Sequence, residues 1–419
     1  MAKIALITGG NGITGSAIIE YLVKNTTASE WSKIIVTSRS PFKTTVHDDR
    51  ITFIALDLSN DPNDLIEKMR PVCGGVTHAY FSSYVHKDDF KELNIANEKL
   101  FSNFLDALIA VAPELENCVL QTGGKHYNVH LGPVPSPARE EDPRKESPIG
   151  NFYYVQEDYL IKRSTGQKWT WNVIRPEAII GHTPKPNGMN SALTYALYFL
   201  VCKELGEEAR MPTNQLYWEG YDDLSDSRLI ANLTIWASTS QKAGNQAFNV
   251  TNGDYFTWRY MWPRIAKYMG ASATDKQVFT KSRPKEGETQ LDVSLAEWAA
   301  DKQEVWDRIC NKHSCPEAKA TWESAIYTVP RSTLGDRRAG RPSRGDTMPP
   351  LRSLDNNEEE LIVEHILHHI KRGFPPRLAD VADIANSLRQ ERGLGPVGRN
   401  WPSTFVKRQL RLQVKSNRK

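Results

Sequence analysis

Three glycines near the N-terminus are spaced so that they could hold a phosphate-containing ligand. Gly9, Gly12 and Gly15 follow an apolar run at residues 3–8 and precede an amphipathic segment at 16–23. A strand, a tight turn and a helix in this order aim backbone N–H groups and the positive end of a helix dipole at a pyrophosphate. Gly9 permits the turn, Gly12 allows the ligand to approach, and Gly15 lets the helix pack close to the strand. The sequence therefore predicts dinucleotide binding by Gly9, Asn11, Gly12, Ile13, Thr14 and Gly15.

The end of the second apolar run carries residues that would choose between two dinucleotides. Arg39 stands between Ser38 and Ser40, directly after the run at 33–37. An acidic residue here would bond the ribose hydroxyl of NAD, whereas an arginine flanked by hydroxyls suits the 2′-phosphate of NADP. We therefore expect NADP(H) as the cofactor, and a solvated surface arginine is the alternative.

Further cofactor contacts are expected where the later apolar runs end. Asp57 and Leu58 follow the third run, and an aspartate at this point can bind the adenine amino group. The alternative for Asp57 is a role in a turn or as a helix N-cap. Ser83 and Gln121 stand at or just after the ends of the next two runs, so we assign them to the same site.

A parallel sheet would bring these residues together. Apolar, strand-like runs alternate with helical stretches such as 63–69 and 90–111; the runs lie at 33–37, 51–56, 76–81, 118–121 and 171–174. Strands separated by helices indicate right-handed βαβ crossovers. We therefore predict an α/β fold, a Rossmann-type doubly wound parallel sheet, with the ligand at the carboxyl ends of the strands.

Three longer motifs resemble one known family. They are LQTGGKHY at 120–127, NFYYVQED at 151–158 and IRP at 174–176, and further matches occur at 218–220, 225–226, 235–237 and 247–249. These blocks resemble the signatures of the progesterone 5β-reductase/iridoid synthase-like family of extended short-chain dehydrogenases, whose glycine loop has the same spacing. The resemblance covers about residues 1–323. It implies an NADP-binding reductase domain whose substrate-binding part lies mainly in 182–323.

The same resemblance implies a rearranged catalytic pair. Ordinary members of the superfamily place a lysine four residues after the catalytic tyrosine, but Asp158 stands there after Tyr154. An acid cannot stabilise a phenolate, so a cation must come from elsewhere, and Lys125 resembles the relocated lysine of the family. We expect Tyr154 to face the substrate oxygen beside the cofactor, with Lys125 as its electrostatic partner. Tyr153, its neighbour, is the alternative.

The resemblance favours 1,4-reduction of an activated C=C bond in an enone or enal, and reduction of a carbonyl group is the alternative reaction. A small secondary-metabolite type of substrate would lie in an apolar pocket. Its candidate walls are Tyr84, Tyr195, Tyr198 and Trp218, each of which could instead belong to the core. A sugar-nucleotide epimerase or dehydratase is a weaker alternative, because it would want the tyrosine–lysine spacing that this chain lacks.

Composition indicates a reduced intracellular protein. Of the 419 residues, 39% are hydrophobic and 25% are charged, as in ordinary folded proteins. The five cysteines are odd in number and scattered, and Cys310 and Cys315 have no second pair, so we predict no metal site. No apolar stretch is long enough to span a bilayer, and the first apolar run is already the first strand, so we expect neither a membrane span nor a leader. We expect a cytoplasmic protein, and an oligomer is compatible with the sequence.

The charge is unevenly distributed. Residues 331–419 hold 18 Lys and Arg against 10 Asp and Glu, a net charge of +8, whereas residues 1–330 hold 35 against 40. An acidic body with a basic C-terminal piece is typical of a separate module that faces nucleic acid. We therefore place a boundary after the reductase at 1–323. Residues 324–334 look like the second half of a helix-turn-helix, so we assign a partial helix-turn-helix with a flexible basic arm to 324–350 and a last domain to 351–419.

The last domain resembles a second family. The blocks EEEL at 358–361, GFPPR at 373–377, VGRNW at 397–401 and FVKR at 405–408 are similar to the centromere protein B-type DNA-binding domain of pogo-like transposases. The resemblance implies a small all-α helix-turn-helix domain that binds duplex DNA, with Arg399, Lys407 and Arg408 on the phosphates. The expected core residues are Leu361, Ile362, Ile366, Leu378, Val381, Ile384, Leu388, Trp401 and Phe405.

Two functions therefore compete. The first is a reductase with an incidental C-terminal fusion. The second is a DNA-binding regulator, nuclear in location, that senses a nicotinamide cofactor through a weakened reductase fold. A sensor needs the glycine loop but not the lysine and tyrosines, so the retention of Lys125, Tyr153 and Tyr154 favours the enzyme.

Overall fold

The computed structural model describes residues 2–322 except for 88, 130–133, 135–136, 146, 148, 188–189 and 282–290, and then residues 359, 362–367, 378–391, 397 and 401–408. The chain divides into two compact units, residues 1–340 and 341–419. This division lies within the basic arm that the sequence placed at 324–350. Each unit is described here by itself.

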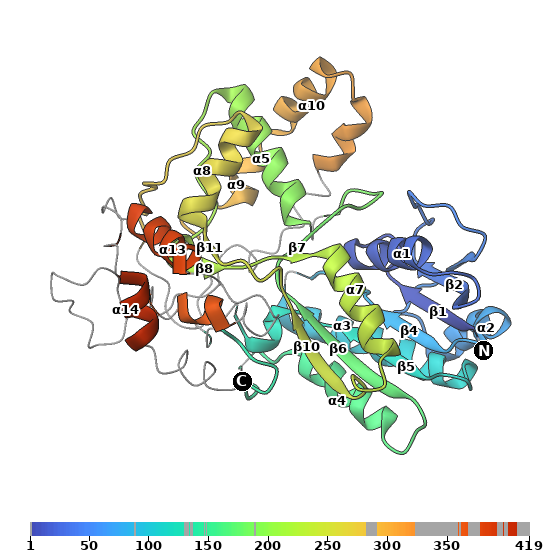
Figure 1. Ribbon diagram of the computed structural model, residues 1–419. Helices are drawn as coiled ribbons and strands as arrows, with labels where there is room; N and C mark the ends of the chain where they lie inside the picture. The colour runs from blue at the N-terminus through green and yellow to red at the C-terminus, as the bar shows by residue number, and fades with distance from the viewer. Residues whose placement is uncertain are drawn as a thin grey trace. The chain divides into compact units, whose positions relative to one another are not determined.

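A seven-stranded parallel sheet forms the centre of the first unit (Figure 1). Its strands, in spatial order, are β10 (Gln246–Val250), β6 (Thr170–Pro176), β5 (Asn117–Gln121), β4 (His78–Phe81), β1 (Lys3–Thr8), β2 (Trp31–Ser38) and β3 (Ile51–Ala55). The chain runs from β1 outward to β3 and then returns to the other side of β1 at β4. A crevice for ligands is therefore expected between the carboxyl ends of β1 and β4, where the direction of winding reverses.

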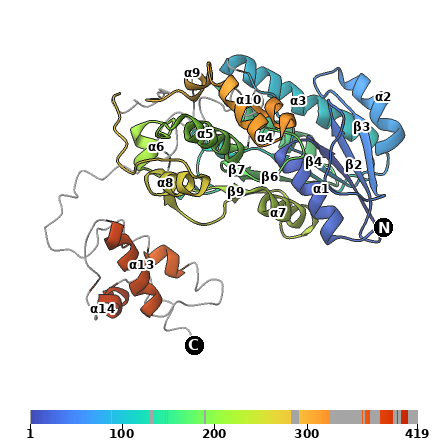
Figure 2. The same ribbon diagram turned by 90° about the horizontal axis from the view of Figure 1, so that it is seen from above.

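Helices cover both faces of the sheet, as Figure 2 shows. On one face α1 (Ile13–Asn25) packs with α7 (Ser227–Thr239), and on the other α3 (Phe90–Val111) packs between α2 (Pro62–Cys73) and α4 (Phe152–Ser164). Two apolar cores result: Ile18 and Ile230 belong to the first, and Leu65, Phe101 and Phe104 to the second. The predicted doubly wound Rossmann fold is confirmed.

A helical part extends the first unit beyond the sheet. It contains α5 (Ser191–Leu205), α6 (Gln215–Glu219), α8 (Trp258–Met269), α9 (Leu295–Ala299) and α10 (Gln303–Lys312), with a 3-10 turn, η2 (Pro316–Ala320). Short strand pairs lie at its base: β7 (Ile179–Ile180) with β9 (Ser225–Asp226), and β8 (Tyr221–Asp222) with β11 (Phe256–Thr257). Its aromatic core includes Tyr195, Tyr198, Trp218, Trp258 and Trp262.

Three of the expected pocket walls belong to that core. Tyr195 packs edge-on against Trp258 and Trp262, Tyr198 donates a hydrogen bond to the Arg210 carbonyl at 2.6 Å, and Trp218 is 2% exposed. Burial raises the pKa of the Tyr198 phenol far above its ordinary value. The prediction of these three as pocket walls is corrected: among the four, only Tyr84 lines the cavity described below.

The second unit contains α13 (Leu378–Glu391) and α14 (Trp401–Arg408). Its core consists of Ile362, Val363, Ile366, Val381, Ala385 and Phe405, with Trp401 stacked on Phe405 at 4.8 Å. Most of the expected core residues are found there, but Leu378 is 50% exposed. Leu361 and Arg399 lie outside the described residues, and Lys407 and Arg408 lie in the last turn of α14. DNA binding stays a prediction.

The five cysteines are all free, and four of them are buried. In the described part of the chain, no three His, Cys, Asp or Glu side chains gather in a way that could hold a metal ion. A search of the same part found no helix with the length and apolarity needed to cross a membrane.

Candidate cofactor-binding and catalytic site

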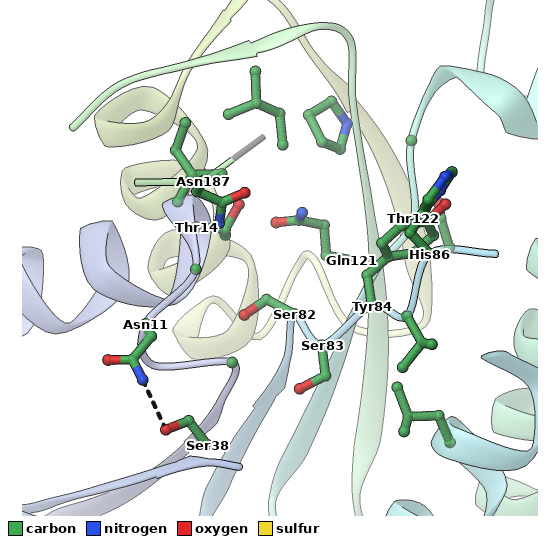
Figure 3. A pocket seen from close by; sticks show the side chains of 18 of the residues that line it. Asn11, Thr14, Ser38, Ser82, Ser83, Tyr84, His86, Gln121, Thr122 and Asn187 are labelled. Carbon is green, nitrogen blue, oxygen red and sulfur yellow. Dashed lines mark hydrogen bonds between the residues drawn. The ribbon is translucent and has the colours of Figure 1, made fainter. Parts of the chain in front are cut away.

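A cavity of about 1050 Å³ lies at the carboxyl ends of the central strands (Figure 3). Most of the predicted cofactor residues line it, and so do Lys125 and Tyr153. The predicted residues on its wall are Gly9, Asn11, Gly12, Ile13, Thr14, Ser38, Arg39, Ser40, Leu58, Ser83 and Gln121. Gly15, Asp57 and Tyr154 are not among the lining residues.

The glycine loop has the backbone form that the motif predicts. Gly9 has a φ of +68°, and its carbonyl accepts a hydrogen bond from the Gly12 N–H at 2.7 Å. Gly12 is the N-cap of α1 and supplies no side-chain cap, and the first turn of α1 carries no acidic residue. The first N–H groups of a helix have no partner within the helix, so those of α1 can face an anion in the cavity.

Gly15 acts through packing. A Cβ added at Gly15 would stand 2.3 Å from the Gly9 carbonyl oxygen and 2.8 Å from the Gly9 carbonyl carbon. Both atoms are backbone, so a side chain here would push α1 away from the loop. The predicted role of Gly15 in close helix packing is thus supported, although Gly15 does not line the cavity.

Gly15→Ala is expected to weaken the affinity for NADPH at least 10-fold and to lower the free energy of unfolding by about 1–3 kcal/mol, because overpacking displaces the loop. Titration of cofactor fluorescence and thermal unfolding measure the two effects. Gly74→Ala is the matched control, since nothing lies within 4 Å of a Cβ at Gly74. Wild-type cofactor affinity in Gly15→Ala would contradict the role of this packing.

Buried polar atoms on the wall fit a polar ligand such as a nicotinamide dinucleotide. Thr14 Oγ1, Gln121 Oε1 and Thr122 Oγ1 are buried and have no hydrogen-bond partner among the described residues. Figure 3 shows Thr14 and Thr122 at opposite sides of the view, with the Gln121 side chain between them. An unsatisfied buried polar group costs about 1–3 kcal/mol. A ligand with hydroxyl, amide and phosphate groups would satisfy these atoms, so the residues present fit the predicted cofactor.

Asn11 joins the glycine loop to the loop after β2. Its amide nitrogen donates to Ser38 Oγ at 3.0 Å, to Ser40 Oγ at 3.1 Å and to the Pro41 carbonyl at 3.2 Å. Its amide oxygen accepts from the Lys43 N–H at 3.0 Å. One side chain therefore fixes the distance between the pyrophosphate loop and the residues expected at the 2′-phosphate.

Lys185 is a second cation at this end of the cavity, and sequence reasoning missed it. It lies between β7 and α5, and its Nζ donates to Ser40 Oγ at 3.2 Å and to the Pro41 carbonyl at 2.8 Å. Lys185 and Arg39 both line the cavity. No local pattern could have found it, because it is 145 residues away from Ser40 in the chain.

Asp57 has the alternative role. Its carboxylate accepts hydrogen bonds from the N–H and the hydroxyl of Ser59, at 3.0 and 2.7 Å. These bonds hold the pKa of Asp57 below its ordinary value although burial opposes the charge. Leu56 and Leu58, on either side of it, line the cavity instead. Asp57 therefore has the turn role that was its alternative, and a contact with the adenine amino group stays a prediction.

Of the two predicted catalytic residues, Lys125 lines the cavity and Tyr154 does not. Lys125 lies in η1 (Gly124–Tyr127), directly after β5, and lines the cavity. Tyr153, in the first turn of α4, also lines it, with its hydroxyl 3.5 Å from the position of a Cβ built on Gly123. Tyr154 instead donates its hydroxyl to the His126 carbonyl at 2.5 Å. The geometry thus favours Tyr153, the alternative that the sequence left open.

The rotation of the helix explains this choice. Neighbouring residues of an α-helix differ by about 100° in direction, so Tyr153 and Tyr154 meet different surroundings. The ring of Tyr154 lies under the Arg144 guanidinium at 4.9 Å, and burial raises the pKa of its phenol. Nothing in the motif itself says which of the two tyrosines points inward.

Aromatic residues continue the wall beside Tyr153. The rings of Phe152 and Tyr153 are 4.4 Å apart, and Tyr84 lies 6.3 Å from Phe152. Burial raises the pKa of Tyr84 to about 12, so its hydroxyl stays protonated. This end of the cavity offers a substrate flat apolar faces next to a pair of polar groups.

Comparison with known proteins agrees with the fold and with the motifs. Residues 5–327 match the model of the PRISE-like Rossmann-fold domain. The chain is 60% identical to the short chain dehydrogenase gsfE of Penicillium aethiopicum, over 78% of this chain and 87% of that protein. It is 35% identical to the (S)-8-oxocitronellyl enol synthase ISY1 of Nepeta racemosa and 33% identical to the 3-oxo-Delta(4,5)-steroid 5-beta-reductase of Arabidopsis thaliana, each over 76% of this chain and 79% of the relative.

Solved structures share the fold at low identity. UDP-glucose 4-epimerase from Thermotoga maritima superposes with a TM-score of 0.51 at 18% identity, over 68% of this chain and 87% of that one. The enzyme WbmH of Bordetella bronchiseptica, solved with NAD+, gives a TM-score of 0.50 at 15% identity, over 78% of this chain and 98% of that one. The family resemblance read from residues 120–127, 151–158 and 174–176 is thus confirmed, and the chain belongs to the PRISE-like Rossmann-fold family of the short-chain dehydrogenase class.

Proposed function

We propose that the first unit is an NADPH-dependent reductase that acts on the activated C=C bond of a small enone or enal. The observation that carries the proposal is the placement of Lys125 and Tyr153 on the wall of the cavity that also carries the glycine loop. The names of two relatives support the reaction class, since one is an enol synthase and the other reduces a 3-oxo-Δ4,5 steroid, which is an enone.

Tyr153 and Lys125 would act on the substrate oxygen. A bound nicotinamide supplies a hydride to an electrophilic carbon. Tyr153 would donate its O–H to the oxygen on which negative charge develops, and the Lys125 ammonium would favour the charge that the phenol takes up. On an enone that oxygen belongs to the enolate, and on a ketone it would belong to an alkoxide. The same pair serves both, so the substrate decides between C=C and C=O reduction.

Preference for NADPH is part of the proposal. Arg39 and Lys185 line one end of the cavity, together with the hydroxyls of Ser38 and Ser40. A 2′-phosphate placed there would accept charge-assisted hydrogen bonds, which are stronger than those between neutral groups. The 2′-hydroxyl of NADH carries no negative charge, so two cations would stabilise it less than a 2′-phosphate.

The proposed reaction is tested with the full-length chain, NADPH and a panel of enones, enals, simple ketones and UDP-sugars. We expect NADPH to be consumed with enones or enals and the product to carry a saturated C–C bond. Consumption with simple ketones alone would move the function to carbonyl reduction. Turnover of UDP-sugars without consumption of NADPH would instead identify an epimerase.

We propose duplex DNA binding as a second function, for residues 341–419. The supporting observation is that this unit has a buried core of its own and lies within the basic stretch of the sequence. If it makes 6–10 phosphate contacts, its affinity should fall about 10³–10⁵-fold between low and moderate salt, and fewer contacts should give a smaller fall.

A gel-shift titration of the full-length chain at two salt concentrations measures this prediction. Replacement of Arg399, Lys407 and Arg408 by glutamine should weaken binding to all sequences alike and flatten the salt dependence, by about one unit of slope per lost contact. Absence of binding at low salt would remove this function and leave the reductase alone.

A further inference from the structure

Side chains of the helix that carries Tyr153 contact the turn that carries Lys125. Three residues of α4 and its cap make these contacts, and they are spaced three apart: Asn151, Tyr154 and Glu157. Residues three apart are neighbours on the surface of a helix. Tyr153, one position before Tyr154, lines the cavity instead.

The first contact comes from Asn151, the N-cap of α4. Its amide oxygen accepts from the Tyr153 N–H at 3.1 Å. Its amide nitrogen donates to the Lys125 carbonyl at 2.7 Å and to Asn128 Oδ1 at 2.9 Å. A single side chain therefore joins the backbones of the two proposed catalytic residues.

The second contact is the hydroxyl of Tyr154, which donates to the carbonyl of His126 at 2.5 Å. Two consecutive carbonyls of η1 are thus bonded by α4. Within the turn itself, His126 N–H donates to the Gly123 carbonyl and Asn128 N–H to the Lys125 carbonyl, both at 2.9 Å. Asn128 closes the turn with a φ of +55°, an uncommon conformation for a residue with a side chain.

The third contact is a buried charge cluster. The Glu157 carboxylate is 5% exposed and lies 3.0 Å from His126 Nδ1, 3.1 Å from an Arg175 nitrogen and 3.4 Å from an Arg144 nitrogen. Burial opposes its charge, but His126 and Arg175 outweigh burial, so the pKa of Glu157 is lowered. Burial also lowers the pKa of His126, although the neighbouring Glu157 carboxylate opposes this shift.

We propose that Asn151, Tyr154 and Glu157 are positioning residues that fix η1 and so place the Lys125 ammonium beside the Tyr153 hydroxyl. This inference rests on the proposed function. It also gives a role to the residue four positions after Tyr153, where ordinary short-chain dehydrogenases have their lysine: Glu157 anchors the turn that supplies the cation. A misplacement of about 1 Å can cost on the order of 10²-fold in rate, so loss of one contact should be visible in kcat.

Two variants test the proposal in the full-length chain. Asn151→Ser keeps an oxygen for the helix cap but removes both donors to η1. Tyr154→Phe removes the bond to the His126 carbonyl, together with the longer contacts of the hydroxyl with the Lys145 backbone at 3.3 and 3.5 Å, and keeps the ring under Arg144. Each should lower kcat about 10-fold or more while KM and the Kd for NADPH stay within about twofold. Asp61→Ser is the control, because it makes a similar change at the cap of α2.

A second measurement is independent of any substrate. The rate at which the Lys125 amine is methylated by formaldehyde and borohydride, followed by peptide mass spectrometry, reports how firmly the turn is placed. We expect several-fold faster labelling in Asn151→Ser and Tyr154→Phe than in the wild type or Asp61→Ser. Unchanged labelling in both variants would overturn the proposal, as would wild-type kcat. Faster labelling in a chain that reduces none of the enones would support the positioning and refute the proposed function.

Discussion

Replacing Tyr153 by phenylalanine is expected to lower kcat about 10²–10⁴-fold, because the change removes the proposed proton donor. The ring remains and can still pack against Phe152, so the fold and the cofactor site should persist. The affinity for NADPH should therefore stay within about twofold of the wild type. Steady-state kinetics on the best enone of the panel and a cofactor titration measure the two quantities.

Tyr154→Phe is the matched comparison. The Tyr154 hydroxyl bonds to the His126 carbonyl, and Tyr154 does not line the cavity. We therefore expect this variant to lower kcat about 10-fold, much less than Tyr153→Phe. If Tyr154→Phe lost 10³-fold and Tyr153→Phe kept full activity, the roles of the two tyrosines would have to be exchanged.

Reversal of the cofactor preference is the second large effect that we expect. Arg39→Asp combined with Lys185→Gln removes two cations from one end of the cavity and introduces a carboxylate that can bond a ribose hydroxyl. A charge-assisted hydrogen bond contributes about 1.5–3 kcal/mol, so the affinity for NADPH should fall roughly 10- to 100-fold per residue. The affinity for NADH should stay the same or rise.

Calorimetric or fluorescence titration of both cofactors measures this prediction. Lys168→Gln is the control, since Lys168 is exposed and does not line the cavity. The single variants Arg39→Asp and Lys185→Gln show how the effect divides between the two cations. Equal affinity of the unmodified protein for NADPH and NADH would contradict the assignment of this end of the cavity to a 2′-phosphate.

The parts of the site that follow from local sequence were predicted. The glycine spacing determines a turn and a helix start by backbone geometry alone, and the alternation of apolar runs with helical stretches requires a parallel sheet. Gly9, Gly12, Ser38, Arg39 and Gln121 therefore occupy the places expected of them. Even the alternative for Asp57, a turn residue, was visible in its position just after a strand.

The parts that depend on long-range packing were not predicted. Adjacent tyrosines carry no local signal of which one points inward, because that is decided by the packing of α4 against η1. Lys185 reaches Ser40 only after the chain has folded back across the cavity. Aromatic side chains are typical of a pocket wall, but they are also typical of an apolar core. The helical part of the unit has such a core, and Tyr195, Tyr198 and Trp218 are buried in it.

The central claim is that this chain reduces an activated C=C bond at the cavity lined by Lys125 and Tyr153. The most direct test uses NADPH that carries deuterium at C4 of the nicotinamide, in each of its two stereoisomers, with an enone and the full-length chain. Nuclear magnetic resonance of the product locates the label. We predict deuterium on the carbon β to the carbonyl, from one stereoisomer only. Deuterium on the carbinol carbon, or a product that carries no deuterium with either stereoisomer, would contradict the claim.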